Sequence, residues 1–174
     1  MLTLLLPLFV VACYSVAAQT KPSVSREVAA DVFAVPDLPL GVQDAVLIKT
    51  DKGVLLRCQL SNNSEEEMTG MRYELVVEQS DEDPRYIFNR SEGFKLKAYE
   101  SRIVTFQTPL RLPLRREQRI VLMPDQAVGA HSIWEVVKAR DALHAYLSGD
   151  YSVVPTVIRV ANQIDAPITP RVIY

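Results

Sequence analysis

The sequence predicts a mostly β protein: an antiparallel β-sandwich with one added α-helix at about residues 133–147. Three observations lead to this class. Several short segments alternate apolar and polar residues, as half-buried strands do. Turn signals separate these segments at intervals of roughly ten residues, which is typical of a sandwich. One later stretch instead has apolar residues at helical spacing.

Length and charge limit the alternatives. The chain has 174 residues, 48% of them hydrophobic, and a formal net charge of −2. This length fits one domain with a real core, which we place at residues 43–165. A charge near zero argues against a nucleic-acid binder, because such binding depends on excess positive charge.

Met1–Ala18 has the pattern of a secretory signal peptide, with an apolar stretch that ends in small residues before a cleavage site at Ala18. Two alternatives remain open. Val10-Val11-Ala12-Cys13 resembles a lipobox, which would make Cys13 a lipidation site. The segment could also stay uncleaved as a short membrane anchor. We therefore expect a periplasmic or extracellular protein, attached to the membrane only through Cys13 or an uncleaved signal.

Cleavage at Ala18 would leave Cys58 as the one cysteine of the mature chain, so no intrachain disulfide could form. We expect Cys58 to be a small buried side chain. Residues 19–42 contain three prolines and little periodicity, which predicts an N-terminal tether with a short strand around Val32–Val35. Residues 166–174 are predicted to be an extended C-terminal tail.

The clearest strand signal lies in Val54–Ser61, where Val54, Leu56, Cys58 and Leu60 fall on one face. Met71–Glu78 alternates in the same way after a polar connection. The other expected strands are Val46–Lys49, Tyr86–Phe88, Phe94–Leu96, Arg102–Phe106, Arg119–Met123 and Val153–Ala161.

The predicted helix begins with Ser132-Ile133-Trp134-Glu135, which has the form of a capping box. Apolar residues then recur at helical spacing as far as Leu147. Gly149 is well placed to end the helix. The predicted span is Ile133–Leu147.

Residues 54–108 resemble the FxLYD-type and related immunoglobulin-like modules of exported bacterial proteins. In that family the second strand carries Phe-x-Leu-Tyr-Asp. Tyr73-Glu74-Leu75-Val76-Val77 keeps the aromatic residue and the leucine. The resemblance implies an immunoglobulin-like sandwich that is not catalytic and lies on the outer side of a membrane.

The sequence contains no zinc-protease, nucleophile-elbow, P-loop or dinucleotide-binding motif, and we expect no cofactor or metal. The leading prediction is an exported, non-catalytic protein with a binding or structural role, whose partner is another protein or a component of the cell envelope. A remote alternative is a small hydrolase that uses His131 or His144 as its base.

A basic loop supports a second hypothesis. Arg111, Arg115, Arg116 and Arg119 lie within nine residues of one another between two expected strands, and could contact an anionic ligand, an anionic polymer or an acidic protein face. The alternative is a solvated loop that balances acidic turns elsewhere.

Two further features remain open at this stage. Thr156–Asn162 could accept a partner strand if it lies at a sheet edge, whereas burial of Ile158 and Val160 would mean that it is already enclosed. Asn62-Asn63-Ser64 and Asn89-Arg90-Ser91 fit the N-glycosylation sequon.

Overall fold

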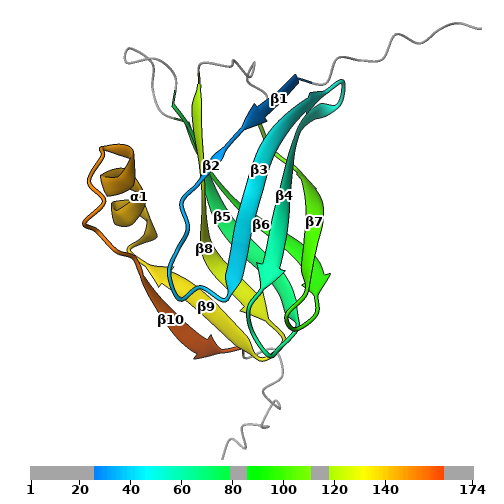
Figure 1. The fold of residues 1–174 in the computed structure, drawn as a ribbon, viewed down its shortest axis with the longest axis vertical. Helices are drawn as coiled ribbons and strands as arrows, with labels where there is room; N and C mark the ends of the chain where they lie inside the picture. Colours follow the sequence, from blue (N-terminus) through cyan, green and yellow to red (C-terminus); the bar gives the residue numbers. More distant parts are fainter. Residues whose placement is uncertain (1–25, 79–85, 111–117, 163–174) are drawn as a thin grey trace, which may run out of the picture.

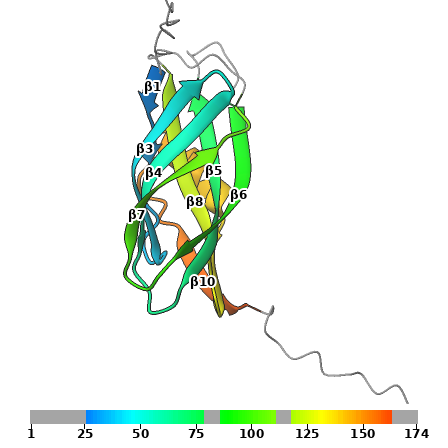
Figure 2. The same cartoon turned by 90° about the vertical axis from the view of Figure 1, so that its right-hand side faces the viewer.

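Two β-sheets face each other and enclose the core, as Figures 1 and 2 show from two sides. The computed structural model describes residues 26–78, 86–110 and 118–162. The smaller sheet has four strands in the order β1-β3-β4-β7. Their bounds are Arg26–Ala29 for β1, Leu40–Thr50 for β3, Gly53–Asn62 for β4 and Ser101–Gln107 for β7.

The larger sheet has six strands, five of them in the order β10-β9-β8-β5-β6. Their bounds are Thr156–Ala161 for β10, Ser132–Val137 for β9, Arg119–Gly129 for β8, Met68–Glu78 for β5 and Tyr86–Leu96 for β6. The sixth strand, β2 (Asp31–Val32), pairs with β8 in parallel, while all other pairs are antiparallel. The predicted mostly β, two-sheet sandwich class is confirmed.

The core lies between the sheets because alternate residues of each strand point inward. The face predicted for β4 is confirmed: Val54, Leu56, Cys58 and Leu60 are all buried. Tyr73, Leu75 and Val77 of β5 oppose them from the larger sheet and are also buried. Val76 of β5 points to the other face and is nevertheless fully buried, so something covers that outer face.

Helix α1 (Ala139–Leu147) provides this cover. Its Arg140 contacts Glu74, which alternates with Tyr73 and Leu75 and therefore points away from the sandwich core. Ala142, Leu143 and Leu147 form the buried side of the helix. The helix thus adds a third layer over part of the larger sheet.

The predicted helix at 133–147 is wrong in its first part, because Ser132–Val137 forms strand β9. Ser132, Trp134 and Val136 are buried in alternation, so period two prevails over the helical spacing. The expected capping pair does not form, since Ser132 accepts from Arg159 and Glu135 accepts from Arg72. Lys138, with φ 54°, adopts the left-handed conformation that separates β9 from α1.

The tether predicted at 19–42 is also corrected where the structure describes it. β1 pairs with Val46–Lys49 of the smaller sheet, and β2 then pairs with Val121 and Leu122 of the larger one. The strand expected at Val32–Val35 therefore lies slightly earlier. This segment contributes Val28, Ala30, Val35, Leu38 and Leu40 to the core. Apolar contact with both sheets holds it in place.

Other boundaries differ less. The two short strands expected at Tyr86–Phe88 and Phe94–Leu96 are one continuous strand, β6. The last strand begins at Thr156 rather than Val153. The predicted signal segment 1–18 and the tail 166–174 lie outside the described residues. Within the described ranges, no helix is both long and apolar enough to cross a membrane.

Candidate functional site

Strand β10 forms one edge of the larger sheet, at the lower left of Figure 1. In the part of the chain that the structure describes, it pairs only with β9. The N–H of Asn162 donates to the carbonyl of His131 at 2.9 Å, directly after the last paired residues. Because hydrogen-bonded pairs alternate along an antiparallel ladder, Ile158 and Val160 also direct their backbone groups toward β9. The backbone groups that face outward are those of Val157, Arg159 and Ala161.

On the outer face of this edge, apolar side chains are exposed beside Glu135 of β9, which lies opposite Ile158. Residues directly opposite each other in a sheet share a face, and Val160 lies opposite Ile133 while Thr156 lies opposite Val137. Ile158 is 43% exposed, Val160 44% and Val137 38%. Ile158 and Val160 are therefore not buried, so the alternative that this strand is already enclosed does not hold.

The other sheet edges carry charge, which discourages strand addition. On β6, Arg90 and Glu92 form an ion pair at 2.8 Å. On β7, Arg102 reaches across to the backbone carbonyl of Lys95 in β6. β1 carries Glu27, which pairs with Arg57 at 3.3 Å. β10, like β7, has one charged residue, and this residue, Arg159, lies on the opposite face from Ile158.

Arg159 is held by three groups at once. Its Nε donates to the Ser132 hydroxyl at 2.9 Å, and its Nη2 donates to Glu66 Oε1 at 3.3 Å. Its guanidinium carbon lies 5.2 Å from the centroid of the Trp134 ring, within the range of a cation–π contact. The one charge of β10 is thus paired within the chain, although the Arg159 side chain itself is 64% exposed.

Glu66 anchors the turn between β8 and β9. Its Oε2 accepts the backbone N–H of His131 at 2.7 Å. Burial alone would raise the pKa of Glu66, but the hydrogen bonds from His131 and Ser132, together with the charge of Arg159, hold it below its ordinary value. A cavity of about 330 Å³ lies beside these groups. Its lining consists of Ser64, Glu65, Glu66, His131, Trp134 and Arg159.

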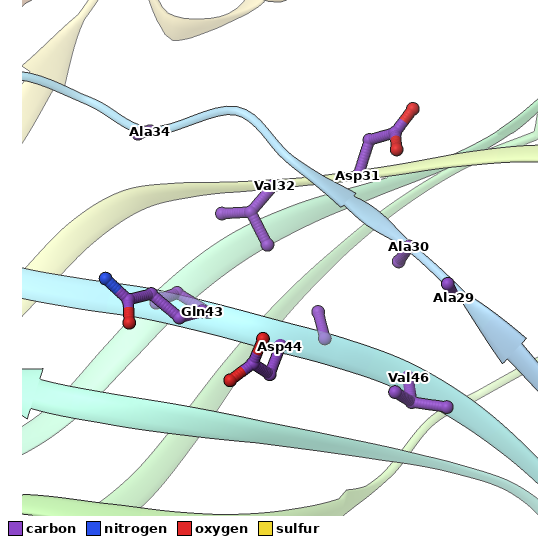
Figure 3. A pocket seen from close by; sticks show the side chains of 10 residues that line it. Ala29, Ala30, Asp31, Val32, Ala34, Gln43, Asp44 and Val46 are labelled. Carbon is purple, nitrogen blue, oxygen red and sulfur yellow. The ribbon is translucent and has the colours of Figure 1, made fainter.

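A larger and more open hollow of about 670 Å³ lies where the chain crosses from β1 to β2, beside β3 (Figure 3). β1 pairs with β3 only from Val46 to Lys49. Among the described residues, the preceding part of β3 therefore has no strand paired to it on this side. Figure 3 shows short apolar side chains around the hollow, with Asp31, Gln43 and Asp44 as its labelled polar residues. Asp31 already pairs with Arg119 at 3.6 Å. The hollow forms because the chain leaves β3 as it passes from β1 to β2. Its lining residues do not bring a nucleophile together with a base.

An ionic cluster lies on the outer face of the larger sheet. Nε of Arg72 donates to both carboxylate oxygens of Asp125, at 3.0 and 2.9 Å, and its Nη2 donates to Glu135 at 3.3 Å. Burial raises the pKa of Asp125, Arg72 opposes this shift, and nearby Glu74 adds to it. Glu74 is buried, and its Oε2 has no hydrogen-bond partner among the described residues. This cluster joins β5, β8, β9 and α1.

Of the predicted basic contact residues, the structure describes one. Arg119 lies in β8, near Asp31 at 3.6 Å and Glu78 at 3.5 Å. Its guanidinium carbon is also 5.4 Å from the centroid of the Tyr146 ring. Arg119 therefore joins three parts of the fold instead of extending from a loop. Arg111, Arg115 and Arg116, like Cys13, lie outside the described residues.

The two histidines and the cysteine noted in the sequence lie in different elements of the fold. His131 lies in the β8–β9 turn and His144 in the last turn of α1. Cys58 is a free, buried thiol whose pKa is raised by burial to about 12. Within the described ranges, no group of three or more His, Cys, Asp or Glu residues could hold a metal ion.

The two sequons differ sharply in accessibility. Asn62 is 1% exposed, and its Nδ2 donates to the carbonyls of Glu66, Leu96 and Lys97 at 2.8, 3.2 and 2.9 Å. The nitrogen that would carry a glycan is therefore enclosed in the folded protein. Asn89 is exposed on β6. Sequence reasoning missed the structural role of Asn62 because an Asn-Asn-Ser run is typical of a simple turn.

Comparison with known protein families, with curated proteins and with solved structures finds no match to this chain.

Proposed function

We propose that the protein is an exported, non-catalytic β-sandwich protein that binds another polypeptide by strand addition along β10. The observation that carries the proposal is the outer edge of this strand. It presents the backbone groups of Val157, Arg159 and Ala161 and the exposed side chains of Ile158 and Val160, without an uncompensated charge. In strand addition, backbone hydrogen bonds give affinity and alternate side chains give specificity.

Export is the second part of the proposal. The signal-like segment at Met1–Ala18 supports it, as does the resemblance of residues 54–108 to modules of exported bacterial proteins. The mass of the mature protein tests this part. We expect an N-terminus at Gln19, whereas an acylated N-terminus at Cys13 would replace simple cleavage with lipidation. An intact Met1 on a protein that stays in the cytoplasm would overturn export.

Site-specific photo-cross-linking in cells that produce the native chain tests the binding function. A photoreactive amino acid at Ile158 should give covalent adducts with a polypeptide, and the same probe at Asn89 on the charged β6 edge serves as the matched control. The Val157→Pro substitution, which removes an outward-facing N–H, should abolish the Ile158 adducts. Equal adducts at both positions, or none at Ile158, would overturn the proposed function.

A further inference from the structure

We infer that the strand added to β10 is β10 of a second copy of this chain, so that two larger sheets join about a two-fold axis at Ile158. This inference rests on the proposed function and names the partner of that edge. An isologous dimer uses the same surface on both copies, so each residue must be compatible with its own symmetry mate. The sequence Thr-Val-Ile-Arg-Val of residues 156–160 meets this requirement.

The backbone limits the possible registers. Hydrogen-bonded pairs across the new interface must join residues whose N–H and C=O face outward, which are Val157, Arg159 and Ala161. An antiparallel pair centred on Ile158 places Val157 opposite Arg159 of the second copy, and does so twice. Every hydrogen-bonded pair in this register thus uses groups that are free of β9.

Side chains distinguish this register from the one centred on Arg159. Centring on Arg159 would place two guanidinium groups directly opposite each other, and such like-charge pairs destabilise a sheet. Centring on Ile158 separates them and leaves each Arg159 with its own Glu66 and Trp134. On the outer face, Ile158 then meets its own symmetry mate and Val160 meets Thr156, which covers side chains that are exposed in the single chain.

Charge also favours a second copy over an unrelated strand. The exposed charges at this edge already have partners within the chain, Arg159 with Glu66 and Glu135 with Arg72, so neither selects an acidic or a basic peptide. A strand rich in β-branched residues suits it, and β10 is such a strand, with the paired Arg159 as its one charged residue. The contact is short, so we expect a reversible dimer with a Kd in the micromolar range or weaker.

Disulfide trapping tests the register in the full chain carrying Cys13→Ser. Ile158 opposes itself as a non-hydrogen-bonded pair, with Cα atoms roughly 4.5 Å apart, a separation that suits a disulfide. Ile158→Cys should therefore give a covalent dimer under mild oxidation, at least tenfold faster than Val160→Cys. Ile103→Cys, exposed on β7, is the control for random collision. Equal trapping at Val160 or Ile103 would overturn the proposed register.

Sedimentation velocity across a range of concentrations tests self-association without a new cysteine. Val157→Pro should abolish the dimer, because it removes an outward N–H inside the register. Ala161→Pro should leave the dimer intact, because its outward N–H lies beyond the paired residues. A protein that stays monomeric, but whose Ile158 photo-adducts contain a different polypeptide, would overturn self-pairing and leave the proposed function standing. A monomer with no adducts at Ile158 would overturn both.

Discussion

Arg159 on the edge strand lies over the ring of Trp134, with its guanidinium carbon 5.2 Å from the ring centroid. Trp134 belongs to β9 and is 9% exposed, so the contact ties the outermost strand to the core. The same guanidinium donates to Glu66, which lies just before β5. A single side chain thus joins an edge strand to its neighbour and to a distant turn.

This contact predicts that Arg159→Lys will loosen β10 although the charge is kept. A lysine ammonium cannot stack on Trp134 and also serve Ser132 and Glu66 as a planar guanidinium does. We expect the amide hydrogens of Ile158 and Val160 to exchange several-fold faster, as measured by NMR. Arg57→Lys is the matched control, because Arg57 pairs with Glu27 at an exposed site. Unchanged exchange in Arg159→Lys would contradict this role.

Glu66 predicts a pH-dependent contribution to stability. Because its pKa in the folded protein is lowered from 4.5, the carboxylate stabilises the fold fully above that value. The contribution is lost as the pH falls through the lower pKa of the folded state. In urea titrations, the wild-type protein should be more stable than Glu66→Gln at pH 7, and the difference should shrink below pH 4.5. A difference that is the same at pH 7 and pH 3 would refute this.

Gly129 is predicted to be intolerant of a side chain. A Cβ at this position would lie 2.6 Å from Glu66 Oε2 and 2.9 Å from Cζ3 of Trp134. We expect Gly129→Ala to lower the free energy of unfolding by about 1–3 kcal/mol, because overpacking forces neighbouring groups to move. Gly93→Ala is the control, since the nearest atom would be 3.9 Å away. Equal stability of the two variants would be evidence against a close fit at Gly129.

Asn62 is predicted to be essential to the turn after β4. Nδ2 shares its two hydrogens among three carbonyls, and Oδ1 accepts from the backbone N–H and the hydroxyl of Ser64 at 2.9 and 2.8 Å. Asn62→Ala should cost about 3 kcal/mol, because it leaves buried carbonyls without a donor. Asn63→Ala, at the exposed neighbouring position, should change stability by less than about 0.5 kcal/mol. Chemical denaturation measures both, and similar losses would contradict the role of Asn62.

Cys58 is predicted to be unreactive in the folded protein. Burial raises the pKa of its thiol to about 12, so the reactive thiolate is scarce near neutral pH. In the full chain carrying Cys13→Ser, Ellman's reagent at pH 8 should leave the native protein unlabelled and label one thiol in urea. Rapid labelling without denaturant would mean that the strand opens.

Period-two alternation predicted the central strands because their inner faces meet a real core. Val54, Leu56, Cys58 and Leu60 illustrate this, since a half-buried strand leaves its pattern in the sequence. The same logic failed at Ser132–Val137, where apolar residues satisfy both a helical and a strand period. Pairing with β8 and β10 makes this segment a strand and not a helix. A short stretch of sequence does not reveal such pairing, because the partner strands lie elsewhere in the chain.

The short strands and the contacts of the candidate site could not be predicted from the sequence, for a different reason. β1 and β2 span four and two residues, too few for any periodicity to appear. The edge position of β10 was raised as an open possibility, but only the strand order fixes it. The link between Glu66 and Arg159 joins residues 93 positions apart, which no spacing rule connects.

The crossing of the N-terminal segment between the sheets also determines the order in which the fold can assemble. β2 pairs Asp31 with Val121, 90 positions further along the chain, and β1 pairs with the much nearer β3. During synthesis β2 therefore leaves the ribosome long before β8, and it has no partner until β8 has followed. Such long-range closure is slow because it carries a large entropic cost. β2, although it lies near the start of the folded domain, is thus among the last strands to find its partner, and its pairing with β8 joins the N-terminal segment to the larger sheet.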